Sequence, residues 1–324
     1  MNAVIETRDL CKDFTTRIKT GRFRSTRRII SAVKGVSLSV EAGETVGYIG
    51  SNGSGKSTTM KMFSGVLTPT AGHVRVCGLE PVPDRLRLTR RLGVVFGQRS
   101  ALWWDLPLKE SFRLLRHVFN VPRADHAARL KRCRQVLDLD EFMDTPVRQL
   151  SLGQRMRGEI TAALLHGPQV LFLDEPTIGL DVVSKQAVRR FLADLKSAGD
   201  TTVLLTTHDL ADIERLCPRL IVIDRGRIVH DGGLRDLRDR YGDGPEVVAE
   251  FDVEFDVALG LDGVTAERVD GDPRRMRFRL DRHRSPGEVV AYLASRAPLR
   301  DVSITEPNID TVVAALYRDG REPS

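Results

Sequence analysis

The sequence predicts an α/β protein built on a parallel sheet, followed by a smaller α+β domain. In the larger part, short apolar runs typical of buried strands alternate with stretches of helical spacing. Polar side chains follow several of these runs, and open α/β sheets bind ligands at the carboxyl ends of their strands. The segment Gly-Asp-Gly-Pro at positions 242–245 then interrupts the chain. We therefore expect one site at one edge of the sheet and a linker near residue 243.

The 324 residues have the composition of a globular protein, with 41% hydrophobic and 29% charged residues. No apolar run approaches the roughly 18 to 20 residues that span a bilayer, and the N-terminus is not a signal peptide, so we expect a cytoplasmic chain. The four cysteines are scattered without a C-x-x-C pair. They indicate buried thiols and favour neither a disulfide framework nor a zinc site.

A basic stretch near the N-terminus can account for the whole net charge of +6, because the rest of the chain is nearly neutral. No acidic residue occurs between Asp13 and Glu41. We interpret the stretch as a solvated, flexible loop between two strands at residues 5–14 and 32–40. Contact with anionic lipid head groups is the functional alternative, and a nucleic-acid surface is the least favoured. The basic residues are Arg17, Lys19, Arg22, Arg24, Arg27 and Arg28.

A glycine-rich segment, Gly-Ser-Asn-Gly-Ser-Gly-Lys-Ser at positions 50–57, fits the pattern G-x-x-x-x-G-K-S/T at every fixed position. It lies between a predicted strand (45–49) and a predicted helix (58–66), so we interpret it as a P-loop. Its N–H groups and the helix start would bind phosphate, Lys56 would add a full charge, and Ser57 would hold Mg²⁺. The expected nucleotide-binding residues are Gly50, Ser51, Asn52, Gly53, Ser54, Gly55, Lys56, Ser57 and Thr58.

The predicted strand at residues 92–96 runs into Gln98. In a nucleotide site its amide can reach both Mg²⁺ and water, whereas elsewhere such a glutamine satisfies backbone groups. Trp103 and Trp104 follow, and adjacent side chains cannot easily both face the core of one element. They indicate an interface or packing against the next helices. We expect residues 108–145 to be wholly helical.

Residues 150–154, Leu-Ser-Leu-Gly-Gln, begin another predicted helix. Ser151 and Gln154 have the spacing of a capping box. A capped helix N-terminus with a glycine in its first turn is equally an anion site. The pattern alone leaves both interpretations open.

Asp174 and Glu175 follow the apolar run at 170–173, which predicts a central parallel strand. Two buried like charges are costly unless something offsets them. Mg²⁺ bound through Asp174 and an attacking water held by Glu175 would do so. The next strand, at 202–206, delivers His208 to the same edge, where it would bond a γ-phosphate oxygen. The expected catalytic residues are Glu175, His208, Gln98 and Lys56, and the expected metal ligands are Ser57, Gln98 and Asp174.

These elements, in this order and spacing, resemble the nucleotide-binding subunits of ABC transporters over about residues 4 to 235. The resemblance also includes the loop Gly179-Leu180-Asp181. It implies an ABC-type P-loop NTPase fold with a helical subdomain. It also implies a homodimer, or a pair with a similar ATPase subunit, in which each ATP lies between one P-loop and the partner's segment 150–154, the signature. The resemblance implies that Ser151, Gly153 and Gln154 contact the ATP bound by the partner's P-loop, and that Asp181 crosses the dimer interface.

The resemblance further implies a membrane partner. Gln98 and residues 102–107, which we call the tryptophan segment, would face an integral membrane permease. Residues 103–107, together with residues 150–157, further resemble ATPases of bacterial exporters whose permease is a separate chain. We therefore expect an Mg-ATP hydrolysing exporter subunit, peripheral on the cytoplasmic face of the membrane, with no nucleic-acid partner. An importer stays open. The alternative is a soluble ABC ATPase acting on nucleic acid or ribosomes, whose relatives carry coiled-coil insertions or two cassettes.

Two positions depart from the family pattern. Leu152 stands where the family usually has a glycine, and the basic stretch is inserted after Phe14. Phe14 is the candidate for stacking on the adenine ring, but an aromatic at a strand end is usually part of the core. Both interpretations stay open.

We expect an ATPase domain over residues 1–240, with a helical subdomain at about 99–165, and an accessory α+β domain over 245–324. The accessory domain carries no catalytic constellation, so a regulatory or dimer-stabilising role and a structural cap are both open. Its predicted strands are at 247–253, 265–269, 275–280 and 302–305, and its helices at 286–297 and 309–317.

Overall fold

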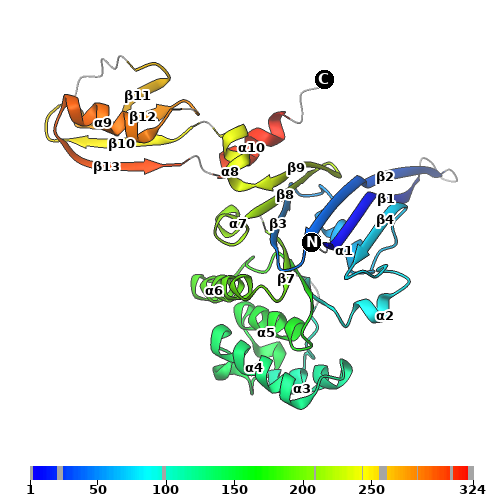
Figure 1. The fold of residues 1–324 in the computed structure, drawn as a ribbon. Helices are drawn as coiled ribbons and strands as arrows, with labels where there is room; N and C mark the ends of the chain where they lie inside the picture. The colour runs from blue at the N-terminus through cyan, green and yellow to red at the C-terminus, as the bar shows by residue number, and fades with distance from the viewer. Residues whose placement is uncertain are drawn as a thin grey trace. The chain divides into compact units, whose positions relative to one another are not determined.

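A computed structural model describes residues 3–19, 25–96, 100–207, 209–242, 244–254, 261–282, 284–306 and 309–319. The chain divides into two compact units, Met1–Asp231 and Gly232–Ser324 (Figure 1). The sequence placed the boundary at residues 240–245, whereas the units divide before α8 (Leu234–Tyr241). In the described parts of the chain, no helix is long and apolar enough to cross a membrane.

The first unit is organised around a six-stranded sheet, which confirms the predicted α/β fold class. In spatial order the strands are β5 (Leu92–Phe96), β6 (Val170–Asp174), β7 (Thr202–Thr206), β3 (Thr45–Gly50), β8 (Arg219–Asp224) and β9 (Arg227–Gly233). Strands β5, β6, β7, β3 and β8 are parallel to one another, and nearly all of their residues are buried, as expected for a sheet covered on both faces.

Four helices directly follow or precede strands of this sheet in the chain, and their apolar faces complete the core. Phe63 of the first helix lies against Phe172 of β6, with ring centroids 6.0 Å apart. Helix α6 buries Val188, Phe191 and Leu192. The helices are α1 (Lys56–Phe63), α5 (Leu152–Leu164), α6 (Val182–Ala198) and α7 (Leu210–Leu216).

A three-stranded antiparallel sheet has the order β2-β1-β4. Strand β1 (Ala3–Lys19) pairs with β4 (Ala71–Val76) only as far as Cys11, but its pairing with β2 (Ser25–Glu41) continues to Lys19. The prediction of a loop after Phe14 is therefore wrong for the described residues there. Residues 14–19 and 25–30, which we call the basic ribbon, form two paired strands. Threonine and isoleucine between the basic residues favour strand structure.

The prediction of one helical stretch over residues 108–145 is also wrong. The structure has α3 (Leu108–Val118) and α4 (Arg123–Leu137), which lie beside α5 (Figure 1), then two 3-10 turns, η1 (Asp140–Phe142) and η2 (Val147–Gln149). Asn120 (φ 52°) and Asp138 (φ 48°) adopt the left-handed conformation between these elements. Asparagine and aspartate tolerate this conformation better than other side chains, so the chain turns there. One further short helix is α2 (Arg85–Leu88).

The second unit contains a four-stranded antiparallel sheet, with α9 (Pro286–Arg296) packed on one face (Figure 1). Phe251 and Phe278 of the sheet and Leu293 of α9 belong to a separate core. Helix α8 contacts α10 (Ile309–Asp319). The strands, in spatial order, are β11 (Val264–Arg268), β12 (Arg275–Leu280), β10 (Glu246–Phe251) and β13 (Leu299–Thr305).

Candidate nucleotide-binding site

The P-loop connects β3 to α1, as the sequence predicts. A Cβ atom at Gly50 would lie 2.3 Å from the carbonyl oxygen of Ile223 on β8, so only glycine fits there. Gly55, the residue before α1, has φ 111°, a conformation that other residues rarely adopt. The loop therefore keeps the tight shape that turns backbone N–H groups toward an anion.

Lys56, at the start of α1, folds back over the loop. Its Nζ donates to the carbonyl oxygens of Gly50 (2.6 Å) and Ser51 (3.2 Å). Burial lowers the pKa of this lysine, and the nearby carboxylates of Glu175 and Asp174 oppose that shift. The ammonium is thus a cation held at the loop by bonds that a phosphate can replace.

Asp174, the last residue of β6, lies against the P-loop helix. Its Oδ2 accepts from the Ser57 hydroxyl at 3.3 Å, and its Oδ1 accepts from the Thr206 hydroxyl at 2.6 Å. A carboxylate and a hydroxyl this close are the hard oxygen donors that Mg²⁺ prefers, and Mg²⁺ usually takes few ligands from a protein. Ser57 and Asp174 therefore fit a magnesium ion.

Glu175 has a left-handed backbone, with φ 57°. Such strain persists only where the surroundings enforce it. Here its N–H donates to the carbonyl oxygen of Thr206 (3.0 Å) and lies 3.2 Å from the Thr206 hydroxyl. Thr206 thus fixes both carboxylate residues. Sequence reasoning missed it, because a threonine at the end of a strand is too common to stand out.

Gln98 and His208 lie outside the described residues, and so does the remainder of segment 97–99. The strands that lead to them end level with Asp174. Phe96, the end of β5, and Thr206, the end of β7, are both register partners of Asp174. We call Lys56, Ser57, Asp174 and Glu175 the phosphate-loop group.

Beyond β7, an ion-pair network ties α7 to α6. Asp209 accepts from Arg189 (3.3 Å) and lies 3.4 Å from Lys185. The buried Asp212 pairs with Arg189 and accepts from the Thr177 hydroxyl at 2.8 Å. Because Thr177 precedes the loop 179–181, this network joins that loop to the segment after β7.

The capping box predicted for residues 151–154 is present. The N–H of Gln154 donates to the Ser151 hydroxyl (3.2 Å), and the N–H of Ser151 donates to the Gln154 side chain (2.9 Å). Ser151 is exposed, so the N-terminal end of α5 faces solvent. Both interpretations of this segment are compatible with that geometry.

The N-termini of α5 and α6 lie against each other. Asp181 caps α6 by accepting from the N–H (2.9 Å) and the hydroxyl (2.8 Å) of Ser184, and these bonds lower its pKa. A Cβ atom at Gly153 would lie 2.1 Å from the Ser184 hydroxyl. Gly153 is therefore needed for packing within the chain. Ser184, three residues after Asp181, could have been found from the cap spacing. We call Ser151, Gly153, Gln154 and Asp181 the signature group.

Leu152, at the position where the family usually has glycine, lies over the loop 179–181. Its Cδ2 is 3.0 Å from where a Cβ atom at Gly179 would be. Leu152 is 42% exposed, and Val182 and Val183 beside Asp181 are each 71% exposed. The signature group is therefore bordered by exposed apolar side chains.

The tryptophan segment is fixed to α5. The buried Glu159 accepts from the N–H of Ala101 (2.9 Å) and from the Ser100 hydroxyl, and its burial raises its pKa. Trp103 is 40% and Trp104 50% exposed, which confirms that the two are not both buried. The segment thus presents two aromatic side chains from a rigid support.

Phe14 lies in β1 opposite Ile30 and is 37% exposed. The ammonium of Lys12 lies 5.4 Å from its ring centroid. This exposure leaves the ring accessible for stacking, and its contact with adenine stays a prediction.

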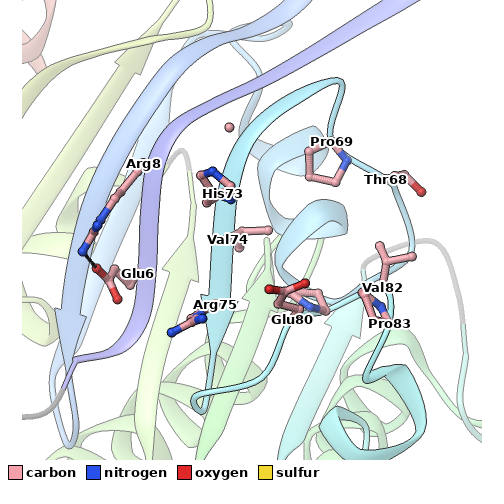
Figure 2. Close-up of a pocket in the computed structure, with 12 residues that line it drawn as sticks. Glu6, Arg8, Thr68, Pro69, His73, Val74, Arg75, Glu80, Val82 and Pro83 are labelled. Carbon is pink, nitrogen blue, oxygen red and sulfur yellow. Dashed lines mark hydrogen bonds and ion pairs between the residues drawn. The ribbon is translucent and has the colours of Figure 1, made fainter.

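A separate cavity of about 460 Å³ is lined by β1, β4 and the segments flanking β4 (Figure 2). Its lining includes Arg8 and Glu6, which form an ion pair with each other, and also His73, Arg75 and Glu80. No P-loop residue lines it. The cavity does not belong to the nucleotide-binding residues.

Comparisons with known proteins identify the family of this chain. The family model for ABC transporters matches residues 33–178. The Nod factor export ATP-binding protein I of Ralstonia nicotianae is 34% identical over 84% of this chain and 88% of that protein. The daunorubicin resistance ATP-binding protein DrrA3 of Streptomyces coeruleorubidus is 33% identical over 90% and 92%. The ATP-binding cassette MJ0796, solved as a dimer in a post-hydrolysis state with ADP and Pi, is 27% identical with a TM-score of 0.59, over 71% of this chain and 99% of that one. This chain therefore belongs to the family of ABC transporter ATP-binding proteins.

Proposed function

We propose that this chain, as an ABC-type ATPase, binds Mg-ATP as a dimer and drives a separate membrane permease that exports its substrate. The observation that carries the proposal is the phosphate-loop group. Lys56 is bonded to the P-loop carbonyls, and Ser57 is bonded to Asp174 across the sheet edge. A lysine, a hydroxyl and a carboxylate at one glycine-rich loop are what a nucleotide triphosphate with its cation requires.

The chain's own residues would divide the work of hydrolysis. Lys56 would exchange the carbonyl oxygens for β- and γ-phosphate oxygens, while Ser57 and Asp174 would hold Mg²⁺, which neutralises charge on the phosphates. Glu175 would orient and deprotonate the attacking water, with its backbone held by Thr206. Gln98 and His208 complete the proposed set, since β5 and β7 end level with Asp174. Positioning and charge stabilisation are the main contributions that phosphoryl transfer needs.

The surroundings of the signature group support a dimer. Leu152, Val182 and Val183 are exposed apolar side chains beside Asp181 and the N-terminus of α5. Such a patch on one surface is typical of an interaction site. We propose that Ser151, Gly153 and Gln154 contact the ATP of a second copy, or of a similar subunit, and that Asp181 crosses the interface. ATP would then close the dimer and hydrolysis would open it.

Trp103 and Trp104 are the proposed contacts to the permease, because exposed tryptophans are frequent anchors of interfaces. Export is favoured over import because the Ralstonia nicotianae relative is named for Nod factor export and the Streptomyces relative for daunorubicin resistance. We accordingly place the chain at the cytoplasmic face of the membrane, with no nucleic-acid partner.

The test uses a tagged Glu175→Gln variant in the native cell. Membranes are solubilised with ATP present, and co-purifying proteins are identified. A polytopic membrane protein at near equal stoichiometry is the expected result. Lys56→Ala is the control, because that variant cannot close around ATP. Recovery from the soluble fraction with nucleic acid or ribosomes would contradict the proposal. Dependence of transport on a substrate-binding protein would change export to import.

A further inference from the structure

Apart from Phe14, the candidate for stacking on adenine, the basic ribbon contains no residue of the proposed nucleotide site. It consists of residues 14–19 of β1 and 25–30 of β2, beyond the last pairing of β1 with β4 at Cys11. We propose that the basic ribbon binds the anionic surface of a lipid bilayer. This inference deepens the proposed membrane location and rests on it, but it needs no contact with the permease.

Register places the arginines together. Arg17 pairs directly with Arg27, and Thr15 pairs with Ile29. Direct partners in antiparallel strands point to the same face, as do residues two apart along one strand. Arg17, Arg27 and Ile29 therefore share one face of the ribbon. All three are exposed, and Ile29 is 66% exposed.

The charges on this face are not balanced within the described residues. Two like charges directly opposite each other destabilise a strand pair. No acidic residue occurs between Asp13 and Glu41, and no ion pair among the described residues involves Arg17, Arg27 or Arg28. An anion between the guanidinium groups would relieve this repulsion.

The arginines of β12 provide the contrast. Arg277 and Arg279 are also on adjacent outward positions of one strand, but they pair with Glu246 and Glu267 at 3.0 to 3.6 Å. The charges of Arg277 and Arg279 are thus neutralised by neighbouring carboxylates. The ribbon face is not.

The guanidinium group matches phosphate oxygens through paired N–H donors. Lipid head groups and nucleic acid both present phosphates, and the apolar side chains decide between them. Ile29, on the same face as Arg17 and Arg27, is 66% exposed. Aliphatic side chains beside arginines suit the boundary of head groups and acyl chains. Binding of single-stranded nucleic acid uses aromatic platforms instead, and Phe14, the aromatic residue of the ribbon, lies on the opposite face from these arginines.

The test measures binding of the purified full chain to sedimented vesicles, without permease. Vesicles contain phosphatidylcholine alone or with phosphatidylglycerol. We expect binding only to the anionic vesicles, weakened by salt. Arg17→Ser with Arg27→Ser should lower the partition coefficient about thirtyfold, since each basic residue contributes about fivefold at such a surface. Ile29→Ser should lower it a fewfold.

The matched control is Arg123→Ser with Arg132→Ser, which removes the same charge from exposed positions of α4. It should lower binding far less. Arg17→Lys with Arg27→Lys keeps the charge and should keep most of the binding, which guards against loss of the fold. All variants should keep the ATPase rate in solution.

Three results would overturn the inference: equal binding by the serine variant and the wild type, equal binding to neutral vesicles, or no binding to either. Tighter binding to DNA at the same phosphate concentration, lost in the serine variant, would instead assign the ribbon to nucleic acid. Because permease capture is measured separately with Glu175→Gln, failure here leaves the proposed function standing.

Discussion

The phosphate-loop group and the signature group both include residues at helix N-termini, but their contacts differ in range. Ser57 and Asp174 are 117 residues apart in the chain, and Glu175 is held by Thr206, 31 residues on. In the signature group, Ser151 bonds Gln154, and Asp181 bonds Ser184, each three residues away. These hydrogen bonds of the first group join α1 to β6 and Glu175 to β7, whereas those of the second are two local caps.

The two groups also differ in whether a bound nucleotide can replace their hydrogen bonds. Lys56 donates to P-loop carbonyls, and Ser57 donates to a carboxylate, so a nucleotide and its cation can replace both bonds. The capping bonds of Ser151 and Asp181 satisfy N–H groups that α5 and α6 would otherwise leave unpaired. We therefore expect substitutions in the first group to alter catalysis and substitutions in the second to alter stability first.

The largest effect is expected from Glu175→Gln. If Glu175 activates water, kcat for ATP should fall by about 10²- to 10⁴-fold with little change in nucleotide affinity. Steady-state ATPase and nucleotide titration check this. Glu288→Gln, an exposed site on α9, is the matched control. Wild-type turnover in Glu175→Gln would remove this role from Glu175.

A smaller loss is expected from Thr206→Val. Valine keeps the shape but removes the hydroxyl that bonds Asp174 and contacts the N–H of Glu175. Because one hydrogen bond to a charged group contributes about 1.5 to 3 kcal/mol, kcat should fall roughly tenfold or more. The Mg²⁺ concentration for half-maximal activity should rise. Thr207→Val is the neighbouring control, and equal kinetics in the two variants would show that Thr206 does not position Asp174.

This difference in range explains what could be predicted from sequence. The P-loop and the capping box are local patterns, so the sequence predicts the strand–loop–helix arrangement and the cap, and the structure has both. Thr206 was missed, because its role arises from the register of β6 with β7. The break at Asn120 was missed too, since helical spacing resumes soon after it. The basic ribbon was predicted as a loop because charge density obscured its strand-forming threonines and isoleucines.

For the signature group, Gly153→Ala should destabilise the first unit. The added methyl group would lie 2.1 Å from the Ser184 hydroxyl, so α6 must shift. Overpacking of this kind costs about 1–3 kcal/mol. Urea unfolding should show it, and adding Ser184→Gly should restore part of the loss. Gly287→Ala, whose Cβ meets only an ordinary contact at 3.6 Å, is the control. A loss of ATPase activity with unchanged stability would contradict the distinction between the groups.

The smallest effect is expected from Asp181→Asn, which keeps the cap but removes its charge. The bonds from Ser184 hold the pKa of Asp181 below its ordinary value of 3.8, so the unfolded chain binds more protons as the pH falls. The stability that the charge contributes is complete above pH 3.8 and is lost as the pH falls through the folded-state pKa. The difference in Tm between wild type and Asp181→Asn should therefore be present at neutral pH and disappear in acid. Asp194→Asn, on the exposed side of the same helix, should show a smaller difference. A difference that stays constant with pH would mean that the amide alters packing and that the charge contributes nothing to the cap.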